Sequence, residues 1–207
     1  PANTLSLHDA LPISCNRCGI DKPIRISELQ RYITDYEKNI NMKVLDKVEA
    51  INEKIAVIGS GPSGIAAAAS LASKGYKVTV FEEKSILGGW LNYGIPPQRL
   101  PKAVVETEMN YVKDLGVEFK KNCNIGKNIK IEDLRAQGYE AFLVSCGMQN
   151  GKAIDIKGAE LEGVLSGVDF LSKAKVNDGN VKVGSHVIVV GGGDVALDRS
   201  EEDTSEL

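Results

Sequence analysis

Two glycine-rich segments have the residue types and the spacing of sites that bind dinucleotides. The first is the run IAVIGSGPSG at residues 55–64, and the second is VIVVGGGDVA at residues 187–196. Glycines at this spacing let the backbone turn tightly out of a strand and approach a pyrophosphate, which then lies on the N–H groups of a helix N-terminus. Two such segments predict an enzyme that holds two dinucleotides and passes electrons between them.

Each glycine of the first segment has its own mechanical role. Gly59 permits the turn out of the strand, Gly61 lets the backbone approach the pyrophosphate, and Gly64 lets helix and strand pack closely. Glu82 ends the next strand, where its carboxylate can accept hydrogen bonds from both ribose hydroxyls. A Rossmann-like unit without a nucleotide is the alternative. The cofactor-binding residues predicted here are Gly59, Ser60, Gly61, Pro62, Ser63, Gly64, Glu82, Glu83 and Gly89.

The second segment predicts the start of another dinucleotide site. Its candidate binding residues are Gly191, Gly193, Asp194, Val195 and Ala196. Alanine in the third place of the motif spreads the helix slightly from the strand, a variant that dinucleotide folds accept. The alternative is a glycine-rich turn in an incomplete domain. The residue that distinguishes NADH from NADPH would lie at the end of the next strand, so the motif leaves that choice open.

The remaining reactive side chains indicate no further chemistry. We see no Ser/His/Asp set and no carboxylate pair, and a lone histidine such as His186 is usually structural. Cys123 and Cys146 are more often small core residues than reactive groups. The four cysteines show no secreted disulfide pattern, which favours a reducing cytoplasm.

Composition excludes several classes of protein. A net charge of −3, without a basic stripe, argues against a nucleic-acid partner. No apolar run has the length of a membrane span, and no signal peptide is recognisable. With 43% hydrophobic and 26% charged residues, the chain has the composition of a soluble globular protein.

Both ends of the chain look foreign to it. Residues 1–13 and 199–207 resemble translated sequencing adapters, although ordinary polar termini are the alternative. We expect neither end to pack stably. The second nucleotide domain would then break off at Asp198, and we expect the fragment alone to be catalytically inactive.

Strands and helices alternate along the sequence, which predicts an α/β fold with a doubly wound, mostly parallel, Rossmann-like sheet. Apolar runs predict strands at residues 54–58, 76–82, 117–120, 141–145 and 186–190. Helical spacing predicts helices at 62–74, 131–137 and 166–175, another after Pro101, and one from Ser27 as N-cap to about Glu37. Residues 84–101 are predicted to be a loop.

Further motifs narrow the family. They are the Gly88-Gly89 pair, NYGIPPQRLP at residues 92–101, KDLGV at 113–117, GVDFL at 167–171 and GGGDVALD at 191–198. Together they make residues 15–198 resemble the family of the glutamate synthase small subunit. This family also includes the flavin portion of dihydropyrimidine dehydrogenase and NADPH-dependent ferredoxin or iron reductase subunits.

The resemblance implies FAD at the first site and NAD(P)H at the second. It also implies that Arg99 contacts the flavin, that the backbone near Ile125 meets the adenine, and that Cys15 is the last ligand of a [4Fe–4S] cluster. Thiolates suit such clusters, although Cys15 and Cys18 also fit half a zinc site or two surface thiols. A partner subunit or a ferredoxin-like carrier would accept the electrons.

The resemblance also sets the expected domain organisation. Residues 14–50 would end a helical iron–sulfur domain, residues 51–180 would form the first part of the FAD-binding domain, and residues 181–198 would start the NAD(P)H-binding domain. The predicted function is an NAD(P)H-dependent FAD oxidoreductase. A non-catalytic dinucleotide-binding subunit and a single-site NAD-dependent dehydrogenase are the alternatives, and the sequence leaves the final electron acceptor open.

Overall fold

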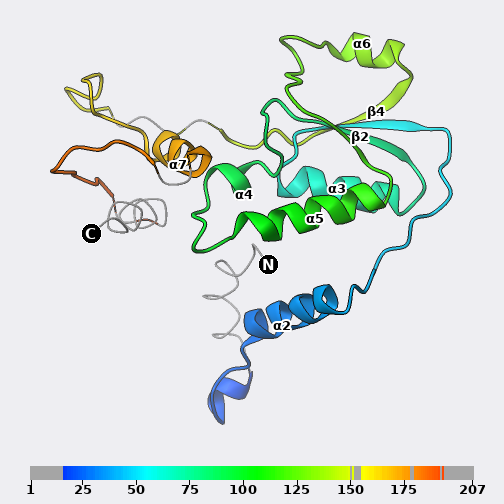
Figure 1. Cartoon of the computed structure of the whole chain (residues 1–207), viewed down its shortest axis with the longest axis horizontal. Helices are drawn as coiled ribbons and strands as arrows, with labels where there is room; N and C mark the ends of the chain where they lie inside the picture. Colours follow the sequence, from blue (N-terminus) through cyan, green and yellow to red (C-terminus); the bar gives the residue numbers. More distant parts are fainter. Residues whose placement is uncertain (1–15, 150, 152–154, 178–179, 192, 194–207) are drawn as a thin grey trace. The chain divides into compact units, whose positions relative to one another are not determined.

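The computed structural model describes residues 16–149, 151, 155–177, 180–191 and 193. The chain divides into two compact units, residues 1–46 and 47–207 (Figure 1). Cys15 and both adapter-like ends lie outside the described residues, and Asp194, Val195 and Ala196 do too. The expectations that concern them therefore stay predictions.

The first unit contains a short 3₁₀ helix, η1 (Asn16–Gly19), and the helix α2 (Ile26–Asn39). The prediction that Ser27 caps α2 is wrong, because the helix begins one residue before it. Arg25 occupies the cap position, and its guanidinium donates to both carboxylate oxygens of Glu28 at 2.9 Å. This pair ties the cap residue to the first turn, where a negative charge also suits the helix dipole.

The second unit is built around a parallel sheet of β1 (Lys54–Ile58), β2 (Lys77–Phe81), β3 (Glu118–Lys120) and β4 (Tyr139–Val144). The strand order is β3-β2-β1-β4, with every neighbouring pair parallel. β2 and β4 therefore flank β1 on opposite sides. In sheets of this kind, ligands bind beyond the carboxyl ends of the strands, where the strand order reverses.

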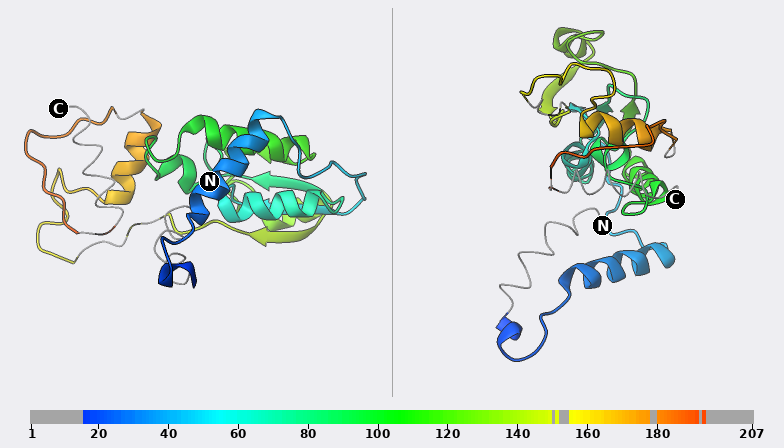
Figure 2. Two further views of the ribbon diagram at one scale, coloured as in Figure 1. Left: turned by 90° about the horizontal axis from the view of Figure 1, so that it is seen from below. Right: turned by 90° about the vertical axis from the view of Figure 1, so that its left-hand side faces the viewer.

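Helices cover both faces of this sheet. α3 (Pro62–Ala72) and α5 (Lys102–Asp114) lie side by side on one face (Figures 1 and 2). On the other face, α6 (Ile131–Ala136) buries Leu134 in a cluster with Ala56, Phe81 and Tyr139. The Phe81 and Tyr139 rings meet edge to face, 5.6 Å apart. The predicted α/β, doubly wound, Rossmann-like fold is confirmed.

Burial explains why the predictions of β1 and β2 succeed. In β1 and β2 the four residues after the opening lysine are all buried, as expected for parallel strands covered on both faces. In α5 the buried residues are Val105, Met109 and Val112, which recur at helical spacing on one side.

Two further predictions fail. Residues 84–101 are not all loop, because α4 (Trp90–Tyr93) forms directly after the glycine pair. The expected strand at 186–190 is absent, and α7 (Gly167–Val176) is the last regular element in the part of the chain that the structure describes. Ile188 is 85% exposed and Val190 is 69% exposed. An apolar run becomes a parallel strand only beside a neighbour that satisfies its backbone, and the described strands pair with none of these residues.

Candidate functional site

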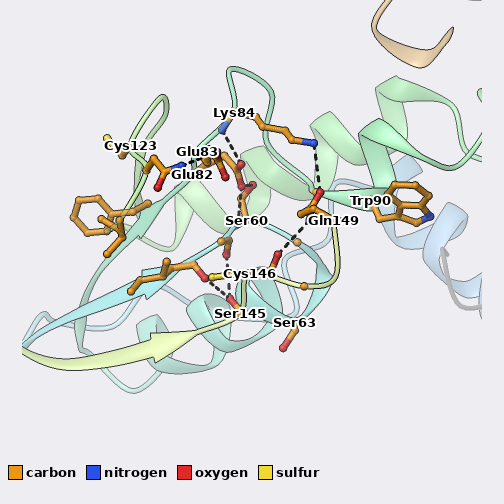
Figure 3. Close-up of a pocket in the computed structure, with 18 of the residues that line it drawn as sticks. Ser60, Ser63, Glu82, Glu83, Lys84, Trp90, Cys123, Ser145, Cys146 and Gln149 are labelled. Carbon is orange, nitrogen blue, oxygen red and sulfur yellow. Dashed lines mark hydrogen bonds between the residues drawn. The ribbon is translucent and has the colours of Figure 1, made fainter. Parts of the chain in front are cut away.

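A pocket of about 370 Å³ lies where the carboxyl ends of β1, β2 and β4 meet (Figure 3). Most of the residues predicted for the first site line it: Gly59, Ser60, Gly61, Pro62, Ser63, Glu82, Glu83, Gly89 and Ile125. Two predicted residues do not. Gly64 is buried inside α3, and Arg99 lies exposed on the turn after α4. The structure thus gathers residues from three separate chain segments at the carboxyl ends of the strands.

The three glycines of the first glycine-rich segment differ in what surrounds them. Gly59 has a φ of +105°, and an added Cβ would lie 2.5 Å from the Ser145 carbonyl oxygen. At Gly64 an added Cβ would overlap the Gly59 carbonyl oxygen. At Gly61, by contrast, an added Cβ would meet nothing within 4 Å. Gly59 and Gly64 are therefore required by the chain itself, whereas Gly61 leaves open space beside the pocket.

The N-terminus of α3 faces this open space. Gly61 is its N-cap residue, Pro62 occupies the first turn, and no side chain caps the helix. The first N–H groups of a helix lack partners inside the helix, and they carry the positive end of its dipole. Beside a pocket, these groups suit an anionic group such as a pyrophosphate.

Glu82 is held by the chain more tightly than the sequence suggests. It is 7% exposed, and its Oε2 accepts hydrogen bonds from the Ser60 backbone N–H at 3.0 Å and from the Ser60 Oγ at 2.5 Å. Its Oε1 accepts from the Lys84 N–H at 2.9 Å. A carboxylate has about four acceptor positions. Three of them accept bonds from the chain itself, which leaves about one open, and the predicted role of Glu82 toward a ribose stays a prediction.

Ser60 and Glu83 extend this network. The Ser60 Oγ also accepts a hydrogen bond from the Gly88 N–H at 3.0 Å, so one hydroxyl joins the turn after β1, Glu82 and the glycine pair. Glu83 is exposed at the pocket and accepts from the Asn124 Nδ2 at 2.6 Å. Its other acceptor positions can supplement the one that Glu82 keeps.

The sequence analysis missed a contact that crosses the pocket. The Lys84 ammonium donates to the Gln149 Oε1 at 3.4 Å (Figure 3). It also lies 4.1 Å from the centre of the Tyr93 ring. The contact with Gln149 joins the loop after β2 to the loop after β4. Lys84 is the single Lys or Arg among the lining residues that the structure describes. Its place two residues after Glu82 was the only available signal.

Tyr93 is buried behind this contact. Its hydroxyl accepts a hydrogen bond from the Ile86 N–H at 3.0 Å. Desolvation of the phenolate raises the pKa of Tyr93 above its usual value. The side chain is therefore neutral at ordinary pH and acts here as packing and as a hydrogen-bond acceptor.

The cysteines near the pocket correct another expectation. Cys123 and Cys146 both line the pocket as free thiols, and Cys146 is exposed rather than a core residue. β4 ends at Val144, which leaves Cys146 in the following loop beyond the covered sheet. Within the described residues, no three His, Cys, Asp or Glu side chains gather as a metal site, and no helix there has the length and hydropathy to cross a membrane.

The second glycine segment forms no site in the described residues. Gly191 and Gly193 are exposed and irregular, and neither lines the pocket. The rest of the motif lies outside the described chain, so its role stays a prediction.

Comparisons with known proteins agree with this geometry. The family model described as pyridine nucleotide-disulphide oxidoreductase matches residues 53–202. The NAD-dependent dihydropyrimidine dehydrogenase subunit PreT of Salmonella typhimurium is 40% identical, over 89% of this chain and 44% of the relative. The glutamate synthase [NADPH] small chain of Bacillus subtilis is 34% identical, over 89% and 39%. The NADPH-Fe(3+) oxidoreductase subunit beta of Geobacter sulfurreducens is 33% identical, over 89% and 28%.

A solved structure has the same fold. It is the oxidoreductase FprA of Mycobacterium tuberculosis in complex with NADPH, with a TM-score of 0.63 and 27% identity, covering 73% of this chain and 36% of FprA. The predicted resemblance to the glutamate synthase small subunit and dihydropyrimidine dehydrogenase is confirmed. The chain spans less than half the length of each of these relatives.

Proposed function

Because the chain belongs to the pyridine nucleotide-disulphide oxidoreductase family, we propose that it holds FAD in an NAD(P)H-dependent flavin oxidoreductase. When bound, FAD would supply the redox chemistry, which is hydride transfer from a nicotinamide and single-electron transfer to an acceptor. The chain's own residues bind and orient the cofactor. Because the cofactor would supply the chemistry, the pocket needs glycines and carboxylates that bind it and no acid–base residues.

The observation that carries this proposal is the space beside Gly61. It adjoins the uncapped N-terminus of α3, and it lies next to a pocket that Glu82 and Glu83 also line. A dinucleotide has a pyrophosphate for the helix and a ribose for the carboxylates, so the donors and acceptors of the chain fit its two polar parts.

The glycine pair favours FAD over NAD at this site. Gly89 has a φ of +54°, and an added Cβ would lie 2.8 Å from the Gly61 Cα. The pair therefore lies directly against the turn after β1, where the pyrophosphate would bind. It is followed by α4 and by the turn that carries Arg99. We propose that Arg99 contacts the flavin and that the backbone at Ile125, which lines the pocket, meets the adenine.

The remaining assignments rest on the relatives. Their names specify NAD or NADPH, which supports a nicotinamide site at Gly191, Gly193, Asp194, Val195 and Ala196. Their names also include "subunit" and "small chain", which supports an electron-accepting partner subunit or a ferredoxin-like carrier. We assign Cys15 to a [4Fe–4S] cluster because thiolates suit iron–sulfur ligation, and we place the protein in the cytoplasm because its cysteines show no secreted pattern.

The test is to express the complete open reading frame that encodes this chain. We expect a yellow protein whose flavin absorbance is bleached anaerobically by NADH or NADPH and restored by ferricyanide. A variant Gly61→Ala serves as the control and should lose the flavin. A colourless protein that FAD does not reconstitute, or a flavin that neither nicotinamide reduces, would contradict the proposal.

A further inference from the structure

One buried lysine has no part in the site described above. Lys175 lies in the last turn of α7 and is 4% exposed. Its Nζ donates to the carbonyl oxygen of Ile95 at 2.7 Å and to that of Leu100 at 3.2 Å. Burying an ammonium costs a large desolvation free energy unless polar groups satisfy it. The two carbonyls lie at the two ends of one turn, residues 95–100, some 75–80 residues earlier in the chain.

One carbonyl accepts the backbone hydrogen bonds inside that turn. The Pro96 carbonyl accepts from the N–H groups of Arg99 and Leu100, each at 3.0 Å. The two carbonyls that Lys175 binds flank this turn, and each precedes a proline, Pro96 or Pro101. Proline has no N–H to donate, so Pro96 and Pro101 add no backbone bond through their nitrogens, and the N–H of Ile95 donates to the Trp90 carbonyl at 3.2 Å. Lys175 joins both flanks to α7.

The helix that carries Lys175 is firmly seated. Phe170, Leu171 and Ala174 lie buried on the same side of α7 as Lys175. α7 packs against α4, which directly precedes the turn (Figure 1). The packing of α7 therefore fixes the position of the Lys175 ammonium. The position of the turn then depends on α7.

We propose that Lys175 is a positioning residue that holds the Ile95–Leu100 turn, and Arg99 within it, in place for the bound cofactor. The holding of the turn stands on the described contacts alone, whereas the link to the cofactor rests on the proposed function. Through this contact, the helix that precedes the second glycine segment fixes a residue assigned to the first cofactor.

The first test needs no substitution. The unmodified chain is treated briefly with acetic anhydride, and acetylation of each lysine is followed by peptide mass spectrometry. Lys173 lies exposed two residues away on the same helix and is the internal reference. We expect Lys175 to be acetylated at least about tenfold more slowly than Lys173, because the reagent reaches its amine only when the contact with the two carbonyls opens. Equal rates at the two lysines would overturn the proposal.

The second test measures the turn itself. Trypsin cleaves after Arg99, and its rate there is compared with cleavage after Lys74 in the same sample. Lys175→Met should raise the ratio of these rates about tenfold, since it frees the turn without opening the whole fold. Lys173→Met should leave the ratio unchanged. An unchanged ratio in folded Lys175→Met would contradict the proposal; if that variant unfolds, the acetylation result decides.

The third test concerns the cofactor. If Lys175 acts through Arg99, then Lys175→Met should weaken FAD binding and shift the absorbance spectrum of the bound flavin. In a chain that already carries Arg99→Met, the same substitution should weaken FAD binding little further. Fully additive effects would show that Lys175 does not act through Arg99. Absence of FAD binding in every chain would refute the proposed function instead, while the protease and acetylation results would still report on the turn.

Discussion

Gly64→Ala is expected to destabilise the second unit severely, whereas Gly61→Ala should leave its stability nearly unchanged. The Cβ at position 64 would overlap the Gly59 carbonyl oxygen and would lie 2.6 Å from the Ser145 Oγ. α3 would have to move away from β1 to make room. We expect a loss of about 3 kcal/mol in the free energy of unfolding, as for overpacking of a tight backbone contact. Urea denaturation followed by circular dichroism measures it.

Gly61→Ala is the matched control because the same methyl group enters open space there. Its φ of −68° is one that alanine adopts readily. The methyl would fill the approach to the N-terminus of α3, so we expect a normally folded chain that has lost dinucleotide binding. Equal unfolding midpoints for the two variants would contradict the packing argument. Undiminished FAD binding by Gly61→Ala would contradict the role of this space.

Glu82→Ala is expected to lower both stability and cofactor binding. The change leaves the Ser60 N–H and the Lys84 N–H without their acceptor inside the protein. Unsatisfied buried donors cost roughly 1–3 kcal/mol each, so we expect a loss of about 2–4 kcal/mol in unfolding free energy. Binding of FAD to the remaining folded protein should weaken by about 1–3 kcal/mol through loss of the ribose contact proposed for Glu82.

Glu83→Ala is the neighbouring control. Glu83 is exposed, and its one described partner is the side chain of Asn124. Its removal should therefore change stability by less than about 0.5 kcal/mol. Thermal melts of both variants, with and without FAD, separate the structural part of the effect from the binding part. Equal melting temperatures for the two variants would show that the buried network contributes nothing to the fold.

Local sequence patterns predicted the framework of this site. Glycine spacing and the apolar run before it located β1 and α3, because both signals depend on neighbouring residues. The same reasoning failed at residues 186–190, since a strand also needs a partner that local pattern does not reveal. It missed α4, because a four-residue helix is too short to show periodicity.

Contacts between distant segments were beyond these patterns. The bond between Ser60 and Glu82 depends on the register in which Ile58 pairs with Phe81, and this register brings the two strand ends together. The contact of Lys84 with Gln149 spans 65 residues. Such contacts follow from the order of strands in the sheet and from side-chain packing, so only the folded structure displays them.

The central claim is that the first pocket binds FAD in preference to a nicotinamide dinucleotide. Titration of this chain with FAD, followed by flavin fluorescence and then competed with NADH, tests it directly. We predict saturable binding of one FAD per chain, at least about tenfold tighter than that of NADH, and its loss in the folded Gly61→Ala variant. Tighter binding of NADH, or no binding of FAD by a folded chain, would contradict the assignment.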